Sequence, residues 1–91
     1  MSKDFKFKTD EGYQYRVENS NLPEHAGLCY DPKSKNPLII IDSTLLPRRE
    51  LSVSIEEFAH AFFFEKTEKK VRKFSATLAK YLDSRGWRKT F

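Results

Sequence analysis

The sequence predicts an α+β domain, in which an antiparallel sheet of two β-hairpins is followed by two packed helices in the order β-β-β-β-α-α. Three observations predict this class. Short alternating or continuous apolar runs fill residues 5–42. Apolar residues recur at spacings of three and four within residues 51–82. The chain of 91 residues can bury one modest core, so we expect a single domain over residues 1–91.

The first hairpin is predicted over residues 5–17. The sequence FKFK alternates apolar and charged residues, and a second alternating run follows at residues 13–18. Between the two runs lies the turn sequence TDEG at residues 9–12. Because successive side chains of a strand point to opposite faces, we expect one set to face the core: Phe5, Phe7, Tyr13, Tyr15 and Val17.

The second strand pair is predicted over residues 27–30 and 38–42, on either side of the turn-rich sequence DPKSKNP. The apolar run LIII at residues 38–41 is typical of a strand that is covered on both faces, or nearly so. The segment 19–25 before this pair contains Pro23, which cannot donate to a regular ladder, so we expect a loop there.

The first helix is predicted from an apolar stripe that consists of Leu51, Ile55, Phe58, Ala59 and Phe62. Two start signals are present. Pro47 suits the first turn of a helix, whereas Ser54 with Glu57 forms a capping box. The helix is expected to reach about Glu65. Val53, Phe63 and Phe64 lie off the stripe, and we expect the two phenylalanines to pack in a wide core.

The second helix has the most regular pattern. Thr67 is a suitable N-cap, and Glu68 suits the positive end of the helix. Gly86 follows Arg85 and provides the left-handed residue that ends many helices. The spacing predicts that one stripe faces the first helix: Val71, Phe74, Leu78, Tyr81 and Leu82, with Ser75 inside it.

Composition and charge narrow the functional classes. The apolar runs are too short to cross a bilayer. The single cysteine, Cys29, allows no internal disulfide and favours the reducing cytoplasm. Residues 66–91 hold nine Lys and Arg against two acidic residues, whereas residues 1–65 hold eight against eleven. Such asymmetry is typical of a solvated lysine-rich helix face, and it can also attract an acidic partner or nucleic acid.

The stretch EEFAH at residues 56–60 differs from the zinc-hydrolase pattern HExxH in its first residue. Ligands at i and i+4 lie one turn apart on the same side of a helix, so Glu56 and His60 can reach one ion. A further carboxylate would complete a set that zinc accepts. The alternative is an ordinary surface pair, with Glu57 serving the capping box.

The run from Gly27 to Trp87 resembles the minigluzincins, which are small HExxH proteins, and related SprT-like domains of phages and bacteria. The matching segments are GLCY (27–30), LIIID (38–42), PRREL (47–51), EEFAHA (56–61), EKKV (68–71) and RGWR (85–88). The resemblance implies a zincin-like fold over about two thirds of the chain.

The resemblance also implies roles for individual residues. Glu57 matches the general base, His60 matches the second zinc histidine, and Glu68 is the nearest candidate for a third ligand on the second helix. Glu56 stands where the family has its first zinc histidine. This departure indicates a degenerate HExxH site, and it leaves the enzyme class open while favouring a protein that is not a catalyst.

Three functions are compatible with these patterns. The favoured one is a non-catalytic, zincin-like cytoplasmic protein that binds a partner protein and needs no cofactor. It would be of the phage accessory or host-modulating kind, acting in the host cytoplasm if the protein is viral. The alternatives are a divergent zinc metallopeptidase that uses Glu56 and His60, and a basic nucleic-acid-binding module that uses the second helix. Candidate partner contacts are Phe64, Lys66, Lys69, Lys70 and Lys73.

Overall fold

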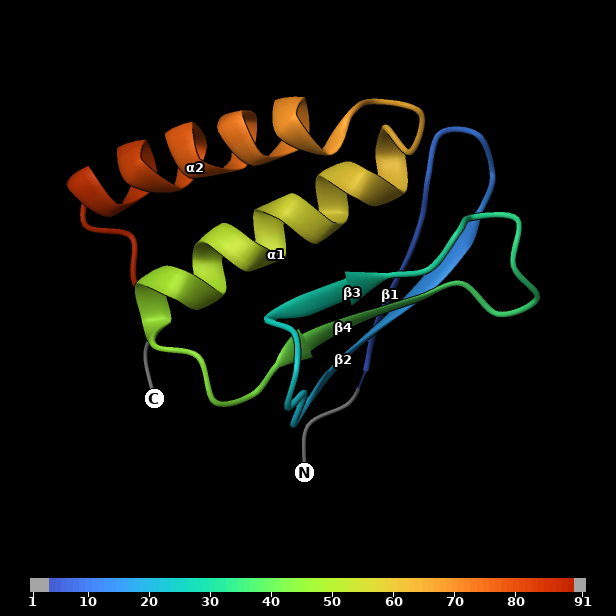
Figure 1. Ribbon diagram of the computed structural model, residues 1–91, viewed down its shortest axis with the longest axis horizontal. Coiled ribbons are helices and arrows are strands. Elements are labelled where there is room, and N and C mark those ends of the chain that lie inside the picture. The colour runs from blue at the N-terminus through green and yellow to red at the C-terminus, as the bar shows by residue number, and fades with distance from the viewer. Residues whose placement is uncertain (1–3, 90–91) are drawn as a thin grey trace.

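The structure is a computed structural model that describes residues 4–89. Four strands precede two helices (Figure 1), which confirms the α+β class. The elements are β1 (Phe5–Lys8), β2 (Gln14–Ser20), β3 (Gly27–Cys29), β4 (Leu38–Asp42), α1 (Pro47–Phe62) and α2 (Glu68–Ser84).

The four strands form one sheet in the order β1-β2-β4-β3. The two outer pairs are antiparallel, as predicted, with Phe7 opposite Tyr15 and Cys29 opposite Ile39. The central strands β2 and β4 are parallel, with Val17 beside Ile39, so the sheet is mixed and not wholly antiparallel. Turn residues identify each hairpin locally. The way in which two hairpins join depends on the connection over residues 21–26, which carries β3 to the far edge.

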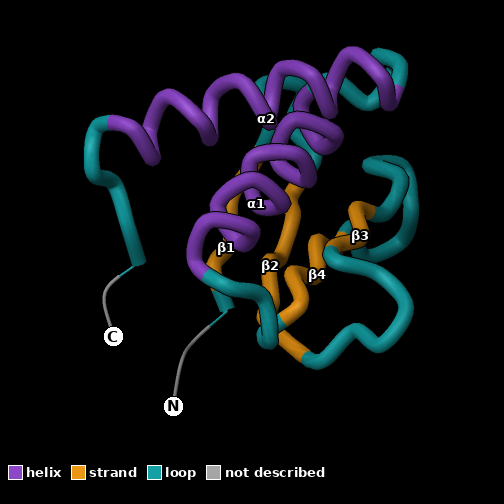
Figure 2. The backbone as a smooth tube through the Cα atoms, turned by 60° about the vertical axis from the view of Figure 1, so that its left-hand side comes forward, coloured by secondary structure: helices purple, strands orange, loops and turns teal. Residues whose placement is uncertain are grey.

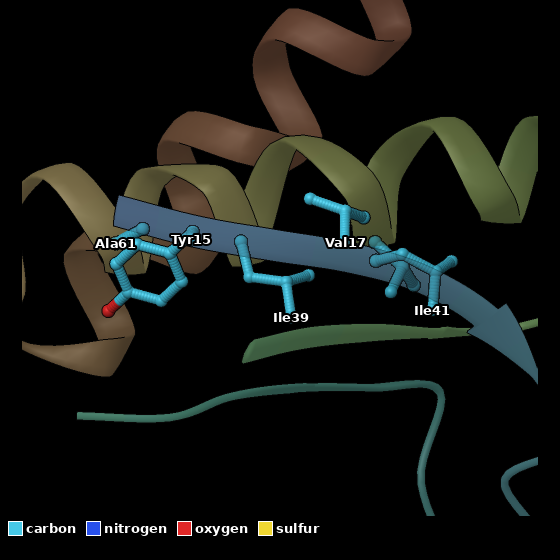
Figure 3. Packing of buried hydrophobic residues seen from close by; sticks show 6 residues of the cluster. Tyr15, Val17, Ile39, Ile41 and Ala61 are labelled. Carbon is cyan, nitrogen blue, oxygen red and sulfur yellow. The ribbon is translucent and has the colours of Figure 1, made fainter. Parts of the chain in front are cut away.

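The core lies between the sheet and α1. Tyr15 and Val17 of β2 and the fully buried Ile39 and Ile41 of β4 point towards α1, where Ala61 meets them (Figure 3). The opposite face of β4 is less covered than predicted, because Leu38 and Ile40 are only half-buried. This difference arises because both helices lie on the same side of the sheet.

The molecule has three layers. Figures 1 and 2 show α1 between α2 and the sheet. Among the described elements, α2 packs against α1 and against no strand. Neither described helix has the length and apolar character that crossing a bilayer requires. The outer helix therefore has a single neighbour in the fold.

The helix termini agree in part with the signals in the sequence, and α1 follows one of its two predicted start signals. α1 begins at Pro47, and Ser54 lies inside it, so the predicted capping box of Ser54 and Glu57 is wrong. The prolyl residue decides the start because its fixed φ suits the first turn. The N-cap of α2 is confirmed, since the Thr67 hydroxyl accepts a hydrogen bond of 3.2 Å from the Lys70 amide. Gly86, with φ of 89°, ends the helix as predicted.

The buried faces of both helices differ from the predicted stripes. The residues that α1 buries are Val53, Glu57, Ala59 and Ala61, and α2 buries Val71, Ser75 and Ala79. Phe74 and Tyr81 of the predicted α2 stripe are exposed. The small side chains at the contact allow the two helices to approach closely, which leaves the large aromatic residues on the flank.

Three phenylalanines expected in the core are also exposed. Phe5 lies on the edge strand β1, where its ring approaches Phe58 of α1 at a centroid distance of 6.3 Å and yet stays 59% exposed. Phe63 and Phe64 come after the end of α1, in the connection to α2, where they are no longer held against the sheet. The wide core predicted for this end of α1 is therefore wrong.

Candidate metal centre

A cavity of about 950 Å³ opens between α1, α2 and the edge strand β3. Each of these elements contributes residues to its wall. Those that matter for the chemistry are Glu56, Glu57 and His60 of α1, Glu68 and Arg72 of α2, and Gly27 of β3. The charged residues of the EEFAH stretch therefore line a cavity that they share with residues of α2 and β3.

Three candidate ligands converge in this cavity. One donor atom each from Glu56, His60 and Glu68 can be chosen so that all three lie within 4.8 Å of one another. The distance between His60 Nε2 and Glu56 Oε2 is 3.9 Å, as expected for residues one turn apart. Both side chains are 17% exposed. These residues lie close enough to hold a metal ion.

The convergence depends on how the chain connects the two helices. Thr67 caps α2, so that Glu68 is its first residue and lies beside the C-terminal half of α1. Glu68, the third ligand that the resemblance suggests, lies in the cluster. Arg72 lies one helical turn after Glu68 on the same side of α2, and its charge is opposite to that of Glu68.

Arg72 provides a positive charge beside the two carboxylates. Its Nη2 donates a hydrogen bond of 3.1 Å to Glu68 Oε1, and its Nε lies 3.8 Å from Glu56 Oε2. The guanidinium is 65% exposed, so it approaches the cluster from the mouth of the cavity. It balances part of the negative charge that the cluster gathers.

Glu57 is the most deeply buried acidic residue of the cavity wall, with 6% of its surface exposed. The pKa of its carboxyl is raised to about 7, chiefly by burial and then by the neighbouring charges of Glu56 and Glu68, while the charge of Arg72 opposes the shift. Among the described residues the structure gives its carboxylate no hydrogen-bond partner. A buried carboxylate that faces a cavity without a partner is unusual in a merely structural role.

The opposite wall of the cavity requires a glycine. A Cβ atom on Gly27 would lie 2.7 Å from Val53 Cγ1 and 3.0 Å from Glu57 Oε2. β3 therefore approaches α1 at the turn that carries Glu57, and only a residue without a side chain fits there. This close contact fixes the position of the Glu57 carboxylate relative to the strand.

Cys29 lies on the same strand and is not a nucleophile. Burial raises the pKa of its thiol to about 12, so the reactive thiolate is scarce near neutral pH. The sulfur lies 3.9 Å from the Tyr15 hydroxyl, and the side chain packs against the core.

The predicted partner contacts fall into two places. Phe64 and Lys66 line the same cavity as the ligand cluster. Lys69, Lys70 and Lys73 are exposed on α2. Their role in binding a partner stays a prediction.

Sequence reasoning missed two residues that shape the cavity. Arg72 stands four residues after Glu68, a spacing that is typical of a helical ion pair and could have identified it. Gly27 carries no such signal, because its importance depends on a distant part of the chain. Comparisons of the chain with family models, curated proteins and solved structures find no match.

Proposed function

We propose that this protein is a metal-dependent hydrolase in which Glu56, His60 and Glu68 bind one divalent ion and Glu57 acts as the base. The convergence of the three donors within 4.8 Å, inside a cavity, is the observation that carries the proposal. It favours the metallopeptidase alternative over the non-catalytic interpretation. Glu56 stands where the minigluzincin pattern has a histidine, and a carboxylate can replace that imidazole as a metal ligand.

The donor set fits zinc. One imidazole and two carboxylates combine the nitrogen and oxygen ligands that zinc accepts, and three protein ligands are typical of catalytic sites. When bound, zinc would supply Lewis-acid polarisation of a carbonyl and would make water more acidic. The two ligand carboxylates would balance the charge of a dication. The resemblance to minigluzincins assigns the same positions to the metal ligands.

Glu57 is suited to move a proton. It is adjacent to the ligands in sequence, faces the cavity and has no other partner among the described residues. A carboxyl with a pKa near neutrality can accept a proton from water and later pass it to a leaving group. The cavity between α1, α2 and β3 has room for a substrate segment, and Glu57 lies on its wall.

The first test is the metal content of protein purified without chelator, measured by mass spectrometry of the elements. We expect about one zinc ion per chain in the wild type and a large loss in His60→Ala. His25→Ala is a matched control, because His25 lines the cavity mouth but is not among the three converging donors. Equal and negligible zinc in all three proteins would contradict the metal centre.

Hydrolysis is tested separately with a mixture of unstructured peptides. Glu57→Gln should keep its zinc and lose at least about a hundredfold in rate, since a positioned base contributes about that much. If the zinc-loaded wild type and Glu57→Gln show the same rate, Glu57 is not the base, even if the metal centre exists.

Arg72 should weaken metal binding, because its guanidinium occupies the carboxylates in the absence of an ion and repels a dication. We expect Arg72→Met to bind zinc about tenfold more tightly, as measured by competition with a chromophoric chelator. Arg85→Met, at the C-terminal end of α2, is the control and should leave the affinity unchanged. Weaker binding in Arg72→Met would show that Arg72 supports the ligands and does not compete for them.

A further inference from the structure

Phe58 and Phe62 of the stripe predicted for α1 and Phe74 of the stripe predicted for α2 border a second groove. This groove has a volume of about 330 Å³ and is lined by Ile55, Phe58 and Phe62 of α1, Phe63 of the connection, and Phe74 of α2. We call it the aromatic groove. It lies on the β1 side of α1, whereas the metal-centre cavity lies on the β3 side, so the body of α1 separates the two.

The floor of the aromatic groove is rigid. Phe7 of β1 stacks on Phe58 with ring centroids 4.7 Å apart and on Phe62 with centroids 5.7 Å apart. Phe5 extends the cluster along β1, 6.3 Å from Phe58. Interlocked aromatic rings lose little entropy when another molecule covers them, so they make good anchors for a partner.

The groove is exposed on its α2 side. Phe63 is 49% exposed and Phe74 is 50% exposed. These values are high for large aromatic residues that lie side by side, and such patches mark sites of interaction. α2 could bury Phe74 only by rotating, which would remove Ser75 and Ala79 from the contact with α1. The exposure therefore results from the packing of the fold.

The rim of the groove is basic on its α2 side. Lys70 lies one turn before Phe74 on the same side of α2, and Lys73 precedes it directly. The Lys66 amide donates to the Phe63 carbonyl, which places its backbone at the end of the groove. Glu65 of the connection is the acidic residue nearest to this end in sequence.

We propose that the aromatic groove binds an amphipathic helix of a partner protein, with an apolar face against the phenylalanines and acidic residues along its edges. A groove beside two packed helices fits a third helix, whose side chains at i, i+3, i+4 and i+7 fill it. The basic rim selects the acidic edges. It also disfavours a second copy of this chain, whose α2 would bring the same lysines into the contact.

The proposal is tested with a fluorescein-labelled helical peptide of about the length of α2, with leucine and phenylalanine on one face and glutamate elsewhere. Fluorescence anisotropy should give a dissociation constant in the micromolar range for the wild type. The same peptide with lysine in place of glutamate should bind at least about tenfold more weakly. Equal binding of both peptides, or binding of neither, would overturn the proposal.

Two variants locate the binding surface. Phe74→Ala changes an exposed side chain, so it should keep the melting temperature and lose about tenfold in affinity for the acidic peptide. Phe64→Ala is the matched control, because Phe64 is similarly exposed but lines the other cavity, and it should bind as the wild type does. If Phe64→Ala weakens binding and Phe74→Ala does not, the peptide binds elsewhere and the proposal fails.

Two other occupants would also overturn the proposal. Light scattering would reveal a dimer that Phe74→Ala dissociates, which would assign the groove to a second copy. Salt-dependent binding of single-stranded DNA that needs Lys70 and Lys73 but not Phe74 would assign the basic face to nucleic acid. His60→Ala should bind the acidic peptide as tightly as the wild type does, so this test does not depend on the metal centre.

Discussion

Glu57→Gln is expected to make the metal-free protein more stable at alkaline pH and to remove a pH dependence from its stability. The folded state holds the carboxyl at a pKa of about 7, against 4.5 for an exposed glutamate. Because the raised value favours the protonated form, the native state binds more protons than the unfolded state between these two values. Stability is therefore greatest below about pH 4.5 and is lost as the pH rises through 7.

The size of this effect follows from the shift. A shift of this extent corresponds to about 3 kcal/mol of unfolding free energy between the acidic and the alkaline limits. Urea unfolding in the presence of a chelator measures the unfolding free energy of the wild type and of Glu57→Gln at about pH 4 and pH 8. From the lower to the higher pH, the stability of Glu57→Gln relative to the wild type should rise by that amount. Glu65→Gln, on the exposed connection, is the control. Parallel stability curves for the wild type and Glu57→Gln would contradict the raised pKa.

Gly27→Ala is expected to destabilise the protein by about 1–3 kcal/mol, as overpacking of a close contact usually does. The added methyl group would lie 2.7 Å from Val53 Cγ1, so β3 must move away from α1. The movement also separates the strand from the Glu57 carboxylate. Urea unfolding measures the loss.

A double-mutant cycle identifies the cause of this loss. Val53→Ala removes the methyl group that the new side chain would meet, so Gly27→Ala should be less damaging in that background than in the wild type. The two substitutions should therefore be non-additive, with the double variant more stable than the sum of the single losses predicts. Strict additivity would show that the close approach is not what requires glycine at this position.

Local signals predicted the elements of the fold well. The strand alternation, Pro47 and Thr67 each act within a few residues, and each is confirmed in the structure. The parallel pairing of β2 and β4 could not be predicted in this way, because it depends on where the chain goes between the two hairpins. The same holds for Val53, which lies off the predicted stripe and yet is buried between α1 and the sheet.

The predicted stripes of the two helices were only partly right, for a related reason. Ala59, Val71 and Ser75 are buried as predicted, whereas Phe74 and Tyr81 are exposed. A stripe marks the most apolar face of a helix. This face is buried in the core only if the helix packs against the core through it. Here α2 touches α1 through Ser75 and Ala79, and its aromatic residues remain outside that contact. The disagreement itself is informative, because local patterns tend to fail at functional surfaces.

The candidate site was partly predictable. The spacing of Glu56 and His60 indicated two donors on one side of a helix, and the structure places them 3.9 Å apart. The third donor, Glu68, came from the resemblance, and its arrival in the cluster depends on the short connection after α1. The burial of Glu57 was not predicted, because the sequence had offered the capping box as its role.

The position of α2 in the outer layer affects how the protein unfolds locally. A helix that rests on one neighbour is among the first to detach in local unfolding, so its amides should exchange with solvent faster than those of β4. Glu68 leaves the cluster whenever α2 detaches, whereas Glu56 and His60 stay on α1. An ion bound by all three donors would hold α2 against α1 and slow the exchange of its amides. The exchange rate of the α2 amides would therefore show whether metal is bound.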